Sequence, residues 1–170
     1  CADSMQSRLV FNALVHQYLI PGIQIGSKVP VDKRTGDLGN VFSTARLVLP
    51  LQGGGCLWCN ELIPSSKLQE EAMSAEERRR QRYVDDEQVT APSVITLNAL
   101  GAAQAVNDFL FHYLGLFDAE QAKSGYLMHY PLERLWRGAD CRSDAACLHC
   151  GMSPRAVYAR GDRSTLPCKS

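Results

Sequence analysis

Two pairs of cysteines constrain the fold of this chain more than any other feature of its sequence. Cys56-x-x-Cys59 and Cys147-x-x-Cys150 share one spacing, and 87 residues lie between the two pairs. A C-x-x-C turn can present two sulfurs to one ion, and zinc prefers four thiolates in a tetrahedron. If the fold brings the pairs together, these four cysteines form one structural zinc site, which ties the middle of the chain to its C-terminal region across a long loop.

Other states of the same thiols are also compatible with the spacing. A single C-x-x-C pair is typical of a thioredoxin-like redox centre. Here two pairs occur in turn-rich loops, and neither pair opens a helix after a βαβ strand, so the pattern favours structural zinc. Four buried reduced thiols, or two disulfides in an oxidising compartment, are the alternatives. Because a closed shell of four thiolates leaves no open position for water, we expect no catalysis at the metal.

The composition limits the class of protein. A chain of 170 residues, 45% of them apolar, is sufficient for one domain with a real core, or for part of a larger domain. Eighteen Lys and Arg balance eighteen Asp and Glu, which argues against a nucleic-acid or membrane-surface partner. No stretch of about 18 residues runs without polar interruption, so the sequence predicts no membrane span.

The hydrophobic pattern predicts an α/β protein. An Asp-Ser pair before an apolar periodic run predicts a helix capped by Asp3 or Ser4. Alternating apolar residues predict a strand over 23–29 and a second over 41–49, joined by a turn-rich connection at 32–40, so that 23–49 forms a hairpin or meander. The apolar face of the first helix is expected to contain Leu9, Val10, Ala13, Leu14 and Tyr18.

The second half of the chain begins with a charged segment over 70–88, for which we predict a short exposed helix and a crossover loop, with a partner-docking segment as the alternative. The strongest helical signal follows Thr90-Ala91-Pro92, and small residues in it permit close approach to a sheet or another helix. We predict two short strands after it, over 126–130 and 132–137. The expected buried face of the helix contains Ile95, Ala99, Ala102, Val106, Leu110 and Tyr113.

The order of these features resembles the ThiF/MoeB/HesA family of adenylyltransferases, in the superfamily of ubiquitin-activating enzymes. The match begins with Cys-Ala-Asp-Ser-x-x-x-Arg-x-x-x-Asn over 1–12 and Pro21. It continues through the strand pair, the first C-x-x-C, the charged crossover, Ala-Pro with its small-residue helix, two strands and C-x-x-C-G. The resemblance covers residues 1–151, the C-terminal part of that domain, and leaves 152–170 as a tail.

The resemblance implies the C-terminal half of a Rossmann-like domain that binds ATP and Mg²⁺. It implies that Asp3 is catalytic and binds the cofactor beside the Mg²⁺-phosphate region, at the C-terminal edge of a parallel strand facing a nucleotide crevice. Ser4, a further cofactor-binding position, stands where the family usually has Asn and keeps a hydrogen-bonding group. Arg8 and Asn12 match helix positions with a mainly structural role. Judged without the family pattern, Asp3 is a helix cap.

The implied reaction is adenylation of the C-terminal carboxylate of a ubiquitin-like or sulfur-carrier protein. The resemblance also implies a cytoplasmic homodimer without nucleic-acid or membrane partners. The family's glycine-rich phosphate loop, ribose-binding acid and phosphate-contacting Arg and Lys correspond to positions before Asp3, so we expect the complete enzyme to draw on a further segment or chain. The alternative is a non-catalytic half of such an enzyme, or a zinc-stabilised protein-interaction module.

Many members of this superfamily carry a nucleophilic cysteine in the crossover segment. Here no cysteine occurs between Cys59 and Cys141, and the crossover contains three consecutive acids at 85–87. Acidic neighbours raise the pKa of a thiol, which is the wrong direction for a nucleophile. We therefore expect adenylation without thioester transfer in this segment.

Overall fold

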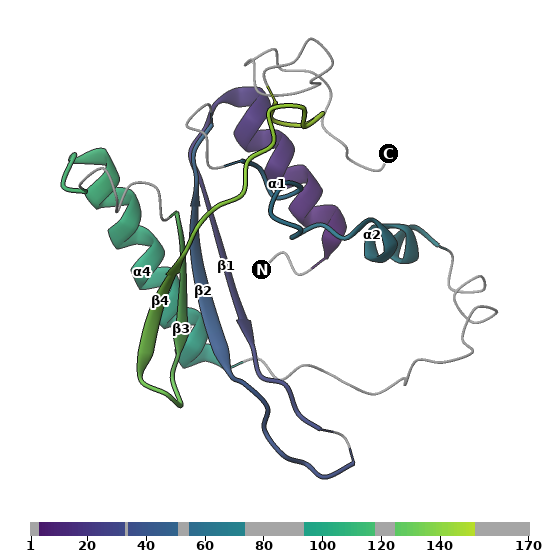
Figure 1. Ribbon diagram of the computed structural model, residues 1–170, viewed down its shortest axis with the longest axis vertical. Helices are drawn as coiled ribbons and strands as arrows, with labels where there is room; N and C mark the ends of the chain where they lie inside the picture. Colours follow the sequence, from purple (N-terminus) through teal and green to yellow (C-terminus); the bar gives the residue numbers. More distant parts are fainter. Residues whose placement is uncertain (1–3, 33, 51–54, 74–93, 118–124, 152–170) are drawn as a thin grey trace. The chain divides into compact units, whose positions relative to one another are not determined.

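A computed structural model describes residues 4–32, 34–50, 55–73, 94–117 and 125–151 (Figure 1). The chain divides into two compact units, and each is described by itself. The first unit comprises 1–21, 49–87 and 142–170, and the second comprises 22–48 and 88–141. Within the described residues, no helix is long and apolar enough to cross a membrane.

The second unit is built on a four-stranded antiparallel sheet in which the strands lie in the order β1-β2-β3-β4 (Figure 1). The predicted meander over 23–49 is confirmed, because the first two strands pair directly with each other. The strands are β1 (Gly22–Lys28), β2 (Phe42–Val48), β3 (Tyr126–Tyr130) and β4 (Leu135–Ala139).

The connection between β1 and β2 is the turn that its composition predicts. An isolated antiparallel bridge joins Val31 to Leu38. Inside it the Asp32 carboxylate accepts hydrogen bonds from the backbone N–H groups of Arg34 (2.8 Å) and Thr35 (3.1 Å). These bonds, that of Thr35 foremost, hold the pKa of Asp32 below its usual value. The side chain thus organises the turn that sets the register of the first two strands.

The long helix α4 (Ile95–Tyr113) packs on strands β1 and β2. Its buried residues are Gly101 and Ala105, so the predicted close approach through small residues is confirmed. A Cβ atom at Gly101 would lie 3.3 Å from the backbone oxygen of Thr44 in β2, which leaves little room for a larger residue. The helix therefore packs on the sheet with its backbone close to the strands.

The buried face of α4 differs from the predicted one. Ile95 is 80% exposed and Tyr113 is 77% exposed, and Val106 and Leu110 are exposed as well. The helix is apolar around most of its circumference, so the periodicity alone fits more than one face. The side with the smallest residues packs on the sheet because it permits the closest approach, and the bulky side chains therefore point away.

The third and fourth strands form a hairpin whose first strand agrees with the prediction. The second begins at Leu135 and not at 132, because residues 131–134 form the turn. In this turn Arg134 adopts a left-handed conformation with a φ of 52°. Across the hairpin the rings of His129 and Trp136 stack with centroids 4.3 Å apart.

The first unit contains helix α1 (Met5–Tyr18) and the shorter helix α2 (Ser65–Ala72). Ser4 caps α1, because its side-chain oxygen accepts a hydrogen bond from the N–H of Ser7 at 3.1 Å. Of the two predicted caps, the structure thus selects Ser4. Helix α2 lies mostly before the charged segment, and the sequence pattern did not predict it.

The buried side of α1 is more polar than predicted. Asn12, His16 and Gln17 are buried, whereas the expected core residues Leu14 and Tyr18 are 38% and 37% exposed. Polar groups can be buried where they find hydrogen-bond partners, and Asn12 has one in the loop that follows Gly55. The apolar spacing of the sequence contains no information on such a partner.

Several predictions concern residues outside the described part of the chain. These are Asp3, most of the charged crossover, and the tail at 152–170. All strand pairs of the described sheet are antiparallel, so the parallel strand expected beside Asp3 is not among them. The Rossmann-like identity of the fold stays a prediction, while the α/β class with an antiparallel meander is established.

Candidate metal centre

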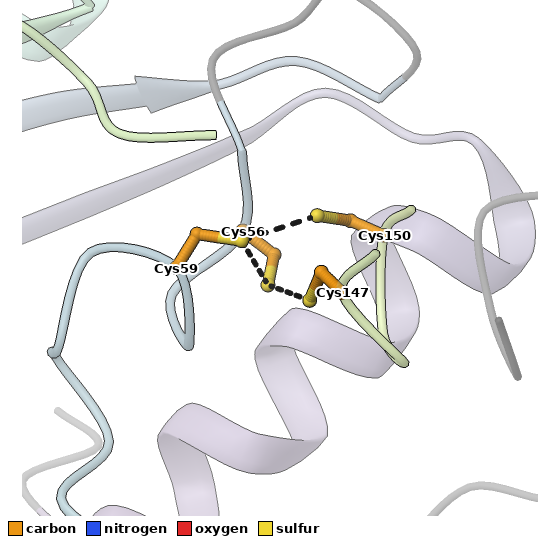
Figure 2. A group of neighbouring side chains, drawn as sticks. All are labelled: Cys56, Cys59, Cys147 and Cys150. Atoms are coloured by element: carbon orange, nitrogen blue, oxygen red, sulfur yellow. Dashed lines mark hydrogen bonds between the residues drawn. The ribbon is translucent and has the colours of Figure 1, made fainter. Parts of the chain in front are cut away.

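The two C-x-x-C turns meet in the first unit and place four sulfurs together (Figure 2). The Sγ atoms of Cys56, Cys59, Cys147 and Cys150 all lie within 4.8 Å of one another. Cys56 is 3.8 Å from Cys147 and 3.8 Å from Cys59, and Cys59 is 3.6 Å from Cys150. In a tetrahedron with zinc–sulfur bonds of about 2.3 Å, the sulfurs are about 3.8 Å apart. The cluster therefore has the dimensions of a four-thiolate metal site.

The cysteines of the cluster are free thiols in this structure. Among the described residues, the free cysteines are Cys56, Cys59, Cys141, Cys147 and Cys150. The printed sulfur separations are well above the roughly 2.05 Å of a disulfide bond. Cys141 belongs to the second unit and is not part of the cluster. The arrangement thus differs from the two-disulfide alternative.

The thiols share protons unequally. The pKa of Cys56 is lowered to about 4, first because the Cys150 thiol donates a hydrogen bond to it and further because backbone amides of Cys59 and Trp58 do so. The pKa of Cys150 is raised, because its proton is held by the hydrogen bond to Cys56. Burial raises the pKa of Cys59. A cation that replaces the protons of these thiols would allow all four to ionise.

Helix α1 holds the first turn and the segment that follows it through two side chains. The Asn12 oxygen accepts a hydrogen bond from the backbone N–H of Leu57 at 2.8 Å, and both residues are fully buried. One turn earlier, the Arg8 guanidinium donates to the carbonyl of Leu62 at 2.8 Å. Both contacts hold backbone, which agrees with the structural role that the resemblance implies for Arg8 and Asn12.

Asn60 joins the two segments that carry the cysteines, and the sequence reasoning missed it. Its side-chain N–H groups donate to the carbonyls of Cys56 and Arg142, each at 2.9 Å. Its side-chain oxygen accepts from the N–H of Arg142, also at 2.9 Å. The signal in the sequence was an asparagine directly after Cys59. An asparagine side chain can donate and accept hydrogen bonds at the same time, so it can pair with a backbone segment.

Two glycines flank the cysteines where no side chain fits. Gly55 has a φ of 65°, and a Cβ atom there would overlap the backbone carbonyl of Arg142. At Gly151 a Cβ atom would lie 2.5 Å from the carbonyl oxygen of Cys147, which accepts a hydrogen bond from the Gly151 N–H. Glycine therefore permits the backbones to pack tightly on both sides of the cluster.

The second turn is held by hydrogen bonds within its own segment. The carbonyl of Asp144 accepts from the N–H of Cys147 at 3.0 Å, and the Asp144 carboxylate accepts from the N–H of Ala146 at 2.8 Å. The N–H of His149 points to the Cys147 sulfur at 3.4 Å. Such amide-to-sulfur bonds stabilise a thiolate.

The residues implied in ATP binding are only partly described. Ser4 acts as the cap of α1, and Asp3 lies outside the described residues. The carboxylate of Glu71 in α2 accepts hydrogen bonds from the N–H groups of Met5 (2.8 Å) and Gln6 (3.0 Å) at the start of α1. Sequence reasoning missed this contact, because 66 residues separate Glu71 from Met5.

Comparison of the sequence with models of known protein families and with curated proteins gives no match. The site is therefore interpreted from its geometry. Four thiols with tetrahedral spacing can hold one metal ion and leave it no open coordination position.

Proposed function

We propose that Cys56, Cys59, Cys147 and Cys150 hold one structural Zn²⁺ ion that fastens the middle of the chain to its C-terminal region. The observation that carries the proposal is the spacing of the four sulfurs, which is close to that of a zinc tetrathiolate. Tetrahedral sulfur sites select zinc or iron. We favour zinc over iron, because the side chains around the cysteines bond backbone groups, as in a structural site, and zinc has no redox chemistry.

We propose further that the chain is part of an ATP-dependent adenylyltransferase that activates the C-terminal carboxylate of a ubiquitin-like or sulfur-carrier protein. The support is the resemblance to the ThiF/MoeB/HesA family in the order of its motifs over residues 1–151. The contacts of Arg8 and Asn12 add to it, because they connect the opening motif to the first cysteine turn within one unit.

Asp3 is the residue of this chain for which the resemblance implies phosphate chemistry, and it comes directly before the cap Ser4 in the sequence. The first amides of α1 are already bonded by Glu71 and Ser4, so the proposal rests on the carboxylate of Asp3 and not on the helix N-terminus. In the proposed enzyme, Asp3 would hold Mg²⁺, and the ion would neutralise triphosphate charge during attack of the carboxylate on the α-phosphate. Ser4 and Glu71 would keep the start of α1, and with it Asp3, in place.

ATP–pyrophosphate exchange with the complete protein tests the proposal. Asp3→Ala should abolish carrier-dependent exchange while zinc content stays unchanged. Asp37→Ala, which removes an exposed carboxylate from the turn after β1, is the matched control and should leave exchange intact. Unchanged exchange in Asp3→Ala would leave Asp3 as a helix-start residue only. A complete protein that binds zinc and shows no exchange with any carrier would favour the non-catalytic interaction module.

A further inference from the structure

The two cysteine turns touch through more than their sulfurs. Trp58 is the third residue of the first turn and His149 is the third residue of the second. Their rings stack with centroids 5.0 Å apart and planes within 10° of parallel. The sulfurs follow the same correspondence, because Cys56 meets Cys147 and Cys59 meets Cys150. Three of the four positions of one turn thus face their equivalents in the other.

The backbone of the two turns repeats this correspondence. The N–H of Trp58 donates to the Cys56 sulfur and the N–H of His149 donates to the Cys147 sulfur. Each ring therefore comes from a residue whose own amide is fixed to a ligand sulfur. The backbone that carries each ring is thus held to a sulfur of its own turn.

We propose that Trp58 and His149 are positioning residues of the metal centre, whose stacked rings hold the two turns at the spacing that the ion requires. The inference rests on the proposed zinc site. The turns are distant in the sequence, so bringing the four ligands together costs chain entropy. A stack between the turns supplies part of the free energy for that step, and the ion then meets ligands that are already spaced for it.

The expected change in zinc affinity follows from the strength of an aromatic pair. A stacked pair contributes enough to change an equilibrium constant roughly two- to tenfold. Loss of the stack should weaken zinc binding by that factor without removing a ligand. The effect depends on a flat ring at 149 and not on an imidazole, so Phe should replace His149 and Ala should not.

The chain contains its own control. The second tryptophan, Trp136, also stacks on a histidine, His129, with ring centroids 4.3 Å apart. That pair lies across β3 and β4 in the other unit, whereas the four cysteines belong to the first unit. The two stacks are chemically alike, and only one of them joins the cysteine turns.

The test measures zinc affinity by competition with a chelator, together with tryptophan emission. His149→Ala should lower zinc affinity roughly two- to tenfold, and His149→Phe should restore it. His129→Ala should bind zinc as the wild type does. In a Trp136→Phe protein, whose remaining tryptophan is Trp58, zinc removal should shift the emission as the indole becomes hydrated. In a Trp58→Phe protein, the emission of Trp136 should stay constant, which also shows that the sheet remains folded.

Unchanged zinc affinity in His149→Ala would overturn the inference, as would failure of His149→Phe to restore it. Equal losses in His149→Ala and His129→Ala would overturn it too, because the effect would then be one of general stability. These results differ from failure of the proposed zinc site, in which the wild-type protein itself would bind no zinc and both proposals would fall.

Discussion

At the scale of single residues, the cysteine cluster depends on positions where the backbone has no room for a side chain. Gly55 precedes the first cysteine turn and Gly151 follows the second, and the neighbouring carbonyls exclude a Cβ atom at both. The side chain of Asn60 joins the two cysteine-bearing segments, because it forms hydrogen bonds with the backbone of Cys56 and of Arg142. The geometry of the sulfurs therefore rests on residues that are not ligands.

Gly55→Ala tests this dependence. Alanine at this position has to adopt a left-handed conformation, which costs about 1–2 kcal/mol. Its Cβ atom would also overlap the Arg142 carbonyl. We expect a larger loss of unfolding free energy than in Gly36→Ala, where φ is 76° and nothing lies within 4 Å. Chemical denaturation of both variants measures the difference. Equal losses would show that the backbone contact at Gly55 has no energetic weight.

The ligand set could be predicted from the sequence, because C-x-x-C spacing encodes a local turn and two such turns suggest one ion. The residues that hold the turns could not. Asn12, Asn60 and Glu71 act on backbone groups far along the chain or in another segment. Hydrogen bonds of this kind depend on tertiary position, and their polar side chains look the same in sequence as ordinary surface residues.

At the scale of elements, helix α1 has its first amides satisfied from two sources. Ser4 accepts from the N–H of Ser7, and the Glu71 carboxylate of α2 accepts from those of Met5 and Gln6. A carboxylate at this end of a helix also interacts favourably with the helix dipole. Helix α2 thereby becomes part of the cap of α1.

Glu71→Ala should therefore destabilise the first unit by about 0.5–2 kcal/mol, the range of a lost helix cap. The neighbouring Glu70 is exposed and provides the control, since Glu70→Ala removes the same charge without a contact to α1. Thermal unfolding of the two variants at equal zinc saturation gives the comparison. A Glu70→Ala loss as large as that of Glu71→Ala would assign the effect to net charge.

Helix α4 carries one acid whose burial opposes ionisation. Burial raises the pKa of Asp108, although a hydrogen bond from Gln104 at 2.8 Å partly offsets this. The folded state holds the proton of this carboxyl more tightly than the unfolded state does. The free energy of unfolding therefore decreases as pH rises from the unfolded pKa of Asp108 through its folded pKa. Asp108→Asn should raise the melting temperature at pH 7 and have little effect at pH 3. A melting temperature that falls at pH 7 would contradict this sign.

The elements themselves were predictable to different degrees. Strands β1 and β2 follow from alternation and a turn-rich connection, both of which are local. The buried face of α4 was wrongly predicted, because an apolar helix offers several faces and only the sheet decides among them. The start of β4 was shifted, because the turn after Pro131 takes its left-handed conformation at Arg134, and arginine is not typical of that conformation.

At the scale of the whole molecule, the four cysteines of the proposed metal centre belong to one of two compact units. The first unit is assembled from segments at the start, middle and end of the chain, so it relies on a connection between them. The second unit has a sheet and a covering helix of its own. Structural zinc binding is worth about 10–16 kcal/mol in small peptides, which is as large as the stability of a typical domain.

Zinc removal should therefore affect the two units unequally. Amide hydrogen exchange should accelerate at Leu57, whose N–H is bonded to Asn12, and at Gly151, whose N–H is bonded to Cys147. The amide of Leu47, which is bonded to Gly125 within the sheet unit, should keep its protection. Uniform acceleration across both units would show that the metal stabilises the molecule as one cooperative body.

The most direct test of the account is the zinc content of the freshly purified chain, measured by elemental analysis. We predict one zinc per chain in the wild type and in Cys141→Ser, because Cys141 lies outside the cluster. We predict none in the double variant Cys56→Ser/Cys147→Ser, which loses one ligand from each turn. A wild-type chain without bound metal after reconstitution with zinc, or a double variant that keeps a full equivalent, would contradict the proposed centre.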